Sequence, residues 1–506
     1  MTDRSMPDRL TQDLRWLGLA LLALTIWRLA AALHAQPELF FDEAQYWDWS
    51  TAPAWGYYSK PPMLAWLIAL STALLGDSEF AVRAPSLVLY PLGAILLYFT
   101  TRRLLAWQPS LHAPAAPLWT ALAYATLPVV ALGSWLITTD AALLFFWSAA
   151  LWALVRAVDL DRWRDWLLLG TLVGLGLLSK YTMVAFGVAA LGWLLSESQR
   201  RGHLTTAKPF VALAIALALF APNLIWNAQH QFASFQHTAE ISQLDQGLLH
   251  PGKLLEFFGA QFAVFGPLLF AILTGLALRP RRWLDNPALR FLAWFVFLPL
   301  ASFMGLALLS RAFANWAAFA YVAATPLIVI ALLQSNSRRL LILALSLNLA
   351  LGAVIYHYHD LARGIGVELT RKTDPYHRIT GWRAFGAAVA AQLAAHPEAR
   401  LLCTDRDVIT ELLYYARPRS RPAYFWNLSG QVRSHYALMN DLGTAPDGAF
   451  LLVGGAMDLA FLRQHFASVT PLPEIVIPVH RDLTRRYSVF LVEGYRPVAT
   501  GIRTSK

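Results

Sequence analysis

Two adjacent carboxylates stand in one polar stretch of an otherwise apolar chain. Asp42 and Glu43 lie in FFDEAQYWDWS, where aromatic residues surround them. Aromatic side chains at this density are typical of a membrane–water interface. A carboxylate held there can act as a general base toward a hydroxyl group. We therefore predict Asp42 and Glu43 as catalytic residues; the alternative is a pair of solvated acids in a loop.

A lysine and three tyrosines accompany these acids. Lys60 follows Tyr57 and Tyr58 in GYYSKPP, and Tyr46 lies within the acidic stretch itself. The two prolines after Lys60 restrict the backbone and hold the residue before them extended. A fixed ammonium group beside phenol hydroxyls is suited to phosphate. We predict that these four residues bind phosphate, although Lys60 also fits an ordinary interfacial lysine.

Three more charged residues stand at the predicted ends of apolar segments on the same side. Asp140 lies in SWLITTDAALLFFW, Lys180 in GLLSKYT and Arg311 in SRAFANWAAFAY. Asp140 also fits a helix N-terminal acid capped by Thr138 or Thr139, and Lys180 fits a cation at a helix C-terminus. We predict Asp140 as a catalytic residue, and Lys180 and Arg311 as part of a cationic pocket with Lys60.

The composition requires that these residues be positioned by membrane helices. The 506-residue chain is 57% hydrophobic and only 14% charged, whereas soluble domains carry about 25% charged residues. About eleven apolar segments have the length of a membrane-spanning helix. They are 15–33, 80–101, 115–134, 138–157, 164–180, 182–197, 207–226, 254–278, 288–309, 314–333 and 338–356. The apolar run at 62–76 is shorter and predicts an interfacial or re-entrant helix instead.

The basic residues predict the orientation of these segments. Within residues 1–358, most Arg and Lys residues fall in alternate turns, as at Arg102-Arg103, Arg200-Arg201 and Arg281-Arg282. Such turns face the cytoplasm, so the net charge of +10 indicates membrane orientation and not nucleic-acid binding. The first loop, 34–79, then faces outward, as does everything after the last segment. We predict a membrane domain over 1–358 and a soluble α/β domain over 359–506.

The histidines and the single cysteine give no metal site. His230, His237 and His250 share one outward loop, but their spacing fits no metal-binding pattern, so we interpret them as solvated. With only Cys403 present, the chain has no intramolecular disulfide framework and no thiolate cluster. A divalent metal is therefore not indicated, and no metal ligands are predicted.

The motifs together resemble a known family. FDEAQYWDWS, GYYSKPP, TTDAALLFFW, GLLSKYT and RAFANWAAFAY are similar to those of GT-C membrane glycosyltransferases: protein O-mannosyltransferases, lipid A aminoarabinose transferases and rhizobial lipopolysaccharide galacturonosyltransferases. The resemblance implies an enzyme of the bacterial inner membrane with its site facing the periplasm. It would move a sugar, with inversion, from a polyprenyl phosphate to lipid A, lipopolysaccharide or another cell-envelope acceptor.

The resemblance also implies roles for individual residues. Asp42 matches the catalytic acid of the first outer loop with Glu43 beside it, Asp140 matches the acid of the second loop, and Lys60 matches the lysine that contacts the donor phosphate. Tyr46 and Tyr57 match tyrosines near that phosphate. Two positions depart from the aminoarabinose group. Gln45 replaces an arginine, and Ser59 replaces a zinc-binding glutamate, which argues against that group's zinc site and its substrate.

Two alternatives stay open at this stage. A protein O-mannosyltransferase would share these residues and differ in its acceptor. A transporter or flippase for a lipid-linked sugar would share the apolar segments and the outward cations. The transporter further predicts an inverted repeat and charged or broken helices near the bilayer midplane, and the sequence shows neither.

Overall fold

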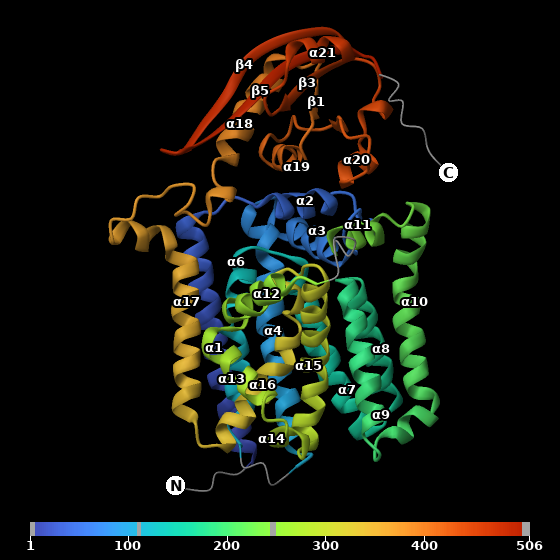
Figure 1. Cartoon of the computed structure of the whole chain (residues 1–506), viewed down its shortest axis with the longest axis vertical. Coiled ribbons are helices and arrows are strands. Elements are labelled where there is room, and N and C mark those ends of the chain that lie inside the picture. The colour runs from blue at the N-terminus through green and yellow to red at the C-terminus, as the bar shows by residue number, and fades with distance from the viewer. Residues whose placement is uncertain (1–5, 109–112, 243–248, 498–506) are drawn as a thin grey trace.

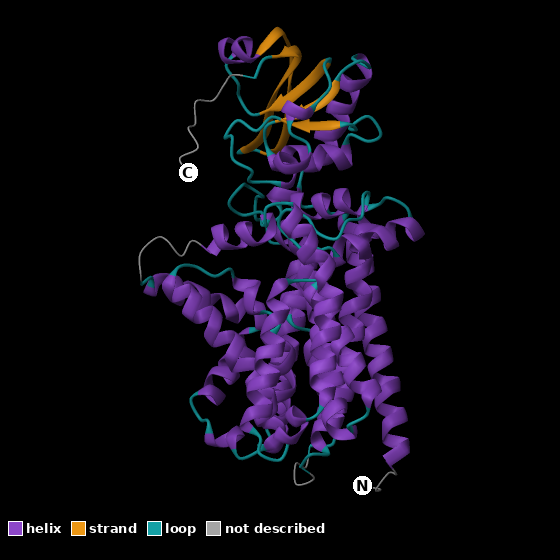
Figure 2. Ribbon diagram, turned by 90° about the vertical axis from the view of Figure 1, so that its right-hand side faces the viewer, coloured by secondary structure: helices purple, strands orange, loops and turns teal. Residues whose placement is uncertain are grey.

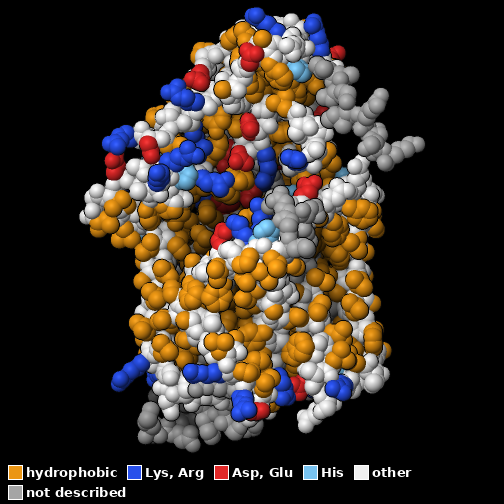
Figure 3. Space-filling model, viewed as in Figure 1, with side chains coloured by type: hydrophobic (Ala, Val, Ile, Leu, Met, Phe, Trp, Pro, Cys, Tyr) orange, Lys and Arg blue, Asp and Glu red, His pale blue; other side chains and the backbone are white. Residues whose placement is uncertain are grey.

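The computed structural model describes residues 6–108, 113–242 and 249–497. Figure 1 shows a bundle of long helices with an α/β unit stacked at one end, and Figure 2 shows that the strands are confined to that end. Large hydrophobic side chains such as Leu22, Leu191 and Leu213 are at least half exposed on the bundle. Figure 3 shows that hydrophobic side chains cover the bundle as an apolar belt. A belt of this kind is expected of a surface in contact with lipid.

Six helices among the described residues are long and apolar enough to cross a membrane, and a seventh crossing results if the bent pair α5–α6 is one span. The pair bends by 47° where Pro128 starts α6. The six long helices are α1 (Met6–Ala35), α4 (Glu79–Leu105), α7 (Thr139–Leu160), α10 (Ala207–Gln229), α15 (Pro287–Leu309) and α17 (Arg338–Gly364), and the bent pair is α5 (Ala116–Ala125) and α6 (Pro128–Trp135).

The other predicted crossings are shorter or interrupted helices, so the number eleven stays a prediction. The segment 254–278 is broken at Gly266, whose φ of +101° favours glycine and precedes Pro267. At 62–76 the structure has a helix of 13 residues, too short to span, as expected. These helices are α3 (Met63–Leu75), α8 (Trp163–Leu177), α9 (Val184–Ser196), α12 (Pro251–Phe265), α13 (Pro267–Ala277) and α16 (Ala320–Gln334).

Small residues let the bundle helices approach closely. At Gly170 of α8, an added Cβ atom would lie 2.3 Å from the carbonyl oxygen of Ala212 in α10. Backbone contact of this kind is a common way to pack membrane helices, because the lipid gives no hydrophobic drive for their association. The short helices α14 (Arg281–Leu284) and α11 (Ala233–Ser242) lie at opposite ends of the bundle, with α11 on the side of the α/β unit (Figure 1).

The α/β unit contains a five-stranded mixed sheet with the order β2-β1-β3-β5-β4. β1 is parallel to β2 and β3, whereas β5 is antiparallel to β3 and β4. The strands are β1 (Arg400–Cys403), β2 (Ala423–Phe425), β3 (Ala449–Gly454), β4 (Phe466–His480) and β5 (Leu483–Tyr495), and the helices are α18 (Trp382–Ala395), α19 (Arg406–Tyr415), α20 (His435–Met439) and α21 (Leu459–His465).

Alternating side chains give this sheet two apolar faces. Leu401 and Leu451 pack with α18 and α19, whereas Leu402 and Leu452 pack with Leu462 of α21. β4 and β5 are much longer than the other strands and form one antiparallel hairpin. α17 runs to Gly364 but is kinked at His357, whose backbone is not helical. The division between 358 and 359 lies just after this kink and stays a prediction.

Candidate functional site

The acidic stretch forms a helix, α2 (Phe41–Ser50), between the bundle and the α/β unit. Figure 1 shows α19 lying directly over it. Trp47 and Trp49 of α2 pack with Leu64 of α3 and with Tyr414 of α19 in one apolar cluster. Aromatic residues that suggested a membrane interface therefore bury α2 against protein on both sides, and they fix the direction of its polar side chains.

Glu43 is an anchor of this helix. Its side chain accepts hydrogen bonds from Arg83 of α4 at 2.7 and 2.8 Å, from the Ile137 amide at 2.8 Å and from the Phe40 amide at 3.0 Å. With 1% of Glu43 exposed, its carboxylate is fully engaged by these donors. The contacts tie α2 to α4 and to the loop before α7, so the geometry gives Glu43 a positioning role.

Asp42 points away from Glu43, toward the α/β unit. One carboxylate oxygen is ion-paired with Arg406 at the start of α19. Arg406 also donates to Gln45 at 2.7 Å, so the residue that departs from the family pattern helps to hold this arginine. The side chains of Asp42 and Arg406 are 37% and 34% exposed. Asp42 Oδ2 makes no hydrogen bond within the described chain and is open to a ligand.

Lys60 supplies a cation to the same region. No described residue accepts a hydrogen bond from its Nζ, although the Lys60 carbonyl accepts one from the Tyr57 amide at 3.1 Å. Burial and the nearby Lys180 lower the pKa of Lys60 to about 8, against the effect of Asp42 and Asp140. Lys60 is therefore largely protonated at pH 7, and its ammonium group is free to bind an anion.

Asp140 and Lys180 form a buried pair beside Lys60. Lys180 Nζ donates to Asp140 at 2.6 Å, and the Asn315 amide donates to the other carboxylate oxygen at 2.6 Å. Thr138 caps α7 by accepting from the Asp140 amide at 3.2 Å, so Asp140 is also the helix N-terminal acid of the alternative interpretation. Asn315 lies in the short helix η3 (Ala314–Ala317). It belongs to the same motif as Arg311 but is not among the predicted site residues.

The three predicted tyrosines differ in what they contact. The Tyr57 hydroxyl donates to the Trp49 carbonyl at 2.9 Å and accepts from the Ala54 amide at 3.0 Å, within its own loop. The Tyr58 hydroxyl donates to the Val432 carbonyl of the α/β unit at 3.0 Å. Burial and then the charge of Asp42 raise the pKa of Tyr46. The Tyr57 and Tyr58 hydroxyls are thus held by main-chain carbonyls, whereas Tyr46 lies close enough to Asp42 to be affected by its charge.

Arg311 and the histidine loop also have definite positions. Arg311 donates to the Ile241 carbonyl at 3.1 Å, and the structure shows no contact with the three acids of the site within its described residues. His237 lies against the Tyr58 ring at 5.1 Å. Burial and then Lys60 lower the pKa of His237 to about 4. It is thus a neutral neighbour of the site at pH 7, and the interpretation of His237 as solvated is wrong.

The charges of the site favour an anionic ligand. Lys60, Lys180 and Arg406 are the cations that face the two carboxylates Asp42 and Asp140, while Glu43 is neutralised separately by Arg83. One positive charge is therefore left over, and it is carried by the unpaired Lys60. Within the described ranges, no group of three or more His, Cys, Asp and Glu residues is arranged to hold a metal ion.

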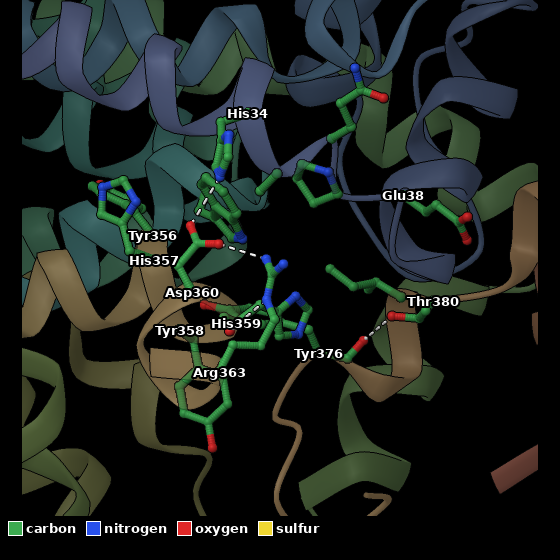
Figure 4. A pocket seen from close by; sticks show the side chains of 15 residues that line it. His34, Glu38, Tyr356, His357, Tyr358, His359, Asp360, Arg363, Tyr376 and Thr380 are labelled. Atoms are coloured by element: carbon green, nitrogen blue, oxygen red, sulfur yellow. Dashed lines mark hydrogen bonds and ion pairs between the residues drawn. The ribbon is translucent and has the colours of Figure 1, made fainter. Parts of the chain in front are cut away.

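A hollow of about 290 Å³, apart from the site described above, lies where α1 and α17 end. Figure 4 shows His34, Asp360 and Arg363 converging there. Asp360 pairs with His34 at 3.0 Å and with Arg363 at 2.6 Å. Next to it, Trp27 of α1 donates to His357 at 3.0 Å. None of the predicted site residues lines this hollow, and its polar groups join α1 to α17.

Comparison with known proteins adds independent evidence. A family model described as dolichyl-phosphate-mannose-protein mannosyltransferase matches residues 59–226. The lipid A galacturonosyltransferase RgtD of Rhizobium johnstonii is 33% identical over 428 residues, which are 83% of this chain and 86% of that protein. An undecaprenyl phosphate-α-4-amino-4-deoxy-L-arabinose arabinosyl transferase of Pseudomonas aeruginosa is 34% identical over 29% of this chain and 26% of its own length.

The fold has a solved counterpart. The crystal structure of ArnT from Cupriavidus metallidurans bound to undecaprenyl phosphate matches with a TM-score of 0.61 at 14% identity, over 94% of this chain and 97% of that one. The fold is therefore that of a multi-pass GT-C membrane protein. Together with the long match to the Rhizobium protein, this confirms the family indicated by the motifs. The chain belongs to the family of GT-C membrane glycosyltransferases that includes the lipid A galacturonosyltransferase of Rhizobium johnstonii.

Proposed function

We propose that this glycosyltransferase moves a sugar from a polyprenyl phosphate to a lipid A or lipopolysaccharide acceptor. The observation that carries the proposal is the unpaired ammonium of Lys60 beside the half-exposed carboxylate of Asp42. The ammonium group can stabilise an anionic leaving group, and the carboxylate can accept a proton from an acceptor hydroxyl. The names of the relatives, a lipid A galacturonosyltransferase and an undecaprenyl phosphate-dependent transferase, support this choice of substrates.

The donor phosphate binds at Lys60. As the bond between the anomeric carbon and the phosphate oxygen breaks, negative charge grows on the phosphate, and a cation already in place stabilises it without reorganisation. Lys180 adds to this field while Asp140 and Asn315 hold its ammonium at fixed distances. In this proposal Asp140 is a positioning residue, and Tyr46 contributes its hydroxyl to the donor.

The acceptor is activated at Asp42. Its free oxygen Oδ2 takes the proton of the acceptor hydroxyl while the hydroxyl oxygen attacks the anomeric carbon, and the polyprenyl phosphate leaves on the opposite face. This single displacement inverts the configuration of the sugar. Arg406 and Gln45 fix the orientation of the carboxylate. For a phosphate acceptor, already ionised, Asp42 would orient the attacking group and take no proton.

The site lies on the periplasmic side of a bacterial inner membrane, and about eleven segments cross that membrane, in this proposal. One feature supports it. The basic turns that predict the cytoplasmic side include α14, which lies at the bundle end opposite the α/β unit (Figure 1). A cysteine placed at exposed Ser429 should react with a membrane-impermeant maleimide added to intact spheroplasts. Labelling only after lysis would reverse this orientation.

The test of function is a transfer reaction with defined substrates. Purified protein in lipid nanodiscs is given undecaprenyl phosphate carrying galacturonic acid, aminoarabinose or mannose. Each donor is paired with lipid A, with lipopolysaccharide core or with a serine- and threonine-rich peptide. Mass spectrometry of the products identifies sugar and acceptor together. We expect a glycosylated lipid; a glycosylated peptide would establish the mannosyltransferase alternative.

Variants separate the site from the fold. Asp42→Asn and Lys60→Ala should each abolish transfer while the protein keeps its size-exclusion profile and thermal midpoint. Asp447→Asn, a change at an exposed acid of the α/β unit, is the matched control and should leave transfer intact. Near-normal turnover by Asp42→Asn or Lys60→Ala would refute the assignment.

A further inference from the structure

A second polar hollow, distinct from the Lys60 site, opens beside α2. It has a volume of about 460 Å³ and lies between Phe41 of α2 and two segments of the α/β unit, residues 371–378 and 483–487. Figure 3 shows blue and red side chains gathered around the recess between the apolar belt and the α/β unit. Its charged lining consists of Arg371, Arg378, Arg485, Arg486 and His377 with one acid, Asp407. The hollow is therefore strongly cationic.

Most of this positive charge is not neutralised. Arg371 and Arg378 are exposed, and neither guanidinium has a hydrogen bond or ion pair with a described residue. Arg486 reaches only Glu474, at 3.4 Å on the surface, a contact of little energetic value. Arg485 donates to the carbonyls of Thr380, His377 and Arg378 at 2.9 to 3.1 Å. It thereby braces the segment that presents Arg378.

The two carboxyl groups that α19 brings near these arginines lie in surroundings that disfavour their charged forms. Burial raises the pKa of Asp407 despite the neighbouring Arg406 and Arg378. Burial also raises the pKa of Glu411, one turn further along the same helix, well above its usual value, with Glu38 adding to the effect. Glu411 is fully buried and both its oxygens lack a hydrogen-bond partner. Its burial thus disfavours the charged form, and Asp407 is the only carboxylate among the described residues that line the hollow.

The hollow adjoins the catalytic acid. Phe41 lines it and precedes Asp42 in α2. The guanidinium of Arg378 lies 5.2 Å from the centre of the Phe41 ring, and that of Arg406, which is paired with Asp42, lies 5.0 Å from it. One aromatic ring therefore separates the arginines of the hollow from the carboxylate. A ligand anchored at Arg378 can place a neighbouring hydroxyl at Asp42.

We propose that this hollow is the acceptor subsite, in which Arg371, Arg378 and Arg486 bind a phosphate or carboxylate group of an anionic glycolipid. This inference rests on the function proposed above and names the feature by which the acceptor is recognised. Guanidinium groups bind phosphate and carboxylate through paired hydrogen bonds, which fix orientation as well as position. The donor uses Lys60 on the bundle side, so the two substrates meet at Asp42 from different anchors.

The test compares acceptors with and without their anionic groups. The double variant Arg371→Gln/Arg378→Gln and the wild type are assayed in nanodiscs with bisphosphorylated lipid A, with dephosphorylated lipid A, and with dephosphorylated lipid A that keeps acidic core sugars. For an acceptor that uses the subsite, the double variant should show an increase of KM of about tenfold or more. The difference should disappear for an acceptor without the anion concerned.

The three acceptors identify the anion. A loss confined to the bisphosphorylated lipid assigns phosphate, and a loss that persists with acidic core sugars assigns carboxylate. The matched control Arg463→Gln removes an exposed arginine of α21, on the other face of the sheet. It should behave as the wild type. Equal KM values for the double variant and the wild type with every acceptor would overturn the subsite.

A binding measurement keeps this inference separate from the proposed function. Protein carrying Asp42→Asn is mixed with vesicles of bisphosphorylated lipid A in phosphatidylcholine, with and without Arg371→Gln/Arg378→Gln. The arginine changes should weaken binding about tenfold, and 0.5 M salt should reduce the difference. If no acceptor is glycosylated yet the arginines govern binding, only the function fails. If glycosylation proceeds and binding is unchanged, only the subsite fails.

Discussion

The pKa of Lys60 predicts how the enzyme responds to pH. With a value of about 8, the side chain is about 90% protonated at pH 7 and about 10% protonated at pH 9. A donor phosphate is held by the protonated form, which exists below the pKa and is lost as pH rises through it. We therefore expect kcat/KM for the donor to be level from pH 6.5 to 7.5 and to fall about tenfold per pH unit above 8.

The surroundings of Lys60 allow the fall of kcat/KM above pH 8, the alkaline limb of the profile, to be assigned to this residue. Lys180 and Arg406 favour the neutral amine, whereas Asp42 and Asp140 favour the ammonium. Of the other groups at this site, His237 titrates near 4 and Tyr58 near 12, both outside the range. Bound donor adds a negative charge beside Lys60, so the limb in kcat should lie at higher pH than the limb in kcat/KM.

The assay is steady-state transfer at subsaturating donor from pH 6.5 to 9.5, with wild type, Lys60→Arg and Lys253→Arg. Arginine stays charged throughout this range, so Lys60→Arg should keep whatever activity it has up to pH 9.5. Lys253, exposed and paired with Glu256, is the control whose replacement should leave the limb in place. A limb near pH 8 that persists in Lys60→Arg would refute the reasoning, and so would a flat wild-type profile.

Two further predictions concern groups that hold the site together. Glu43→Ala leaves Arg83 buried without its carboxylate and should lower the free energy of unfolding by about 3–5 kcal/mol; loss of the exposed Glu256 should cost less than about 1 kcal/mol, and equal thermal midpoints for the two variants would contradict the anchoring role. Tyr57→Phe removes a hydroxyl that bridges two main-chain groups and should lower stability by about 1–3 kcal/mol. A higher donor KM for Tyr57→Phe at unchanged stability would instead support the predicted role of Tyr57 in phosphate binding.

The sequence predicted the neighbourhood of the site better than the partners within it. Asp42 and Lys60 stand in short motifs, so their types and spacing were visible. Asp42 and Glu43 were interpreted alike because they are adjacent, but consecutive residues of a helix point about 100° apart. One therefore faces the α/β unit and the other the bundle. Which of the two is buried depends on Arg83, and nothing in the local pattern reports that contact.

Long-range partners explain most of what the sequence missed. Arg406 lies 364 residues after Asp42 in an ordinary-looking segment, so its pairing depends on how α19 docks on α2. The number of membrane crossings could not be determined from the sequence for a different reason. Composition records where a segment is apolar, whereas the break at Gly266, the early end of α8 and the late start of α16 show where its helix is interrupted. A helix that stops early gives no signal in hydropathy.

The docking of α19 on α2 has a consequence for biosynthesis. Ribosomes make α2 near the start of the chain, but Arg406, Arg421 and Tyr436, which contact Asp42 and Asp48, are made near its end. Until the α/β unit has folded onto α2, those acids lack these partners and the arginine hollow does not exist. A chain interrupted during translation can complete its membrane helices and still lack the arginine hollow. If that hollow is the acceptor subsite proposed above, sugar transfer starts only after the last segment is in place.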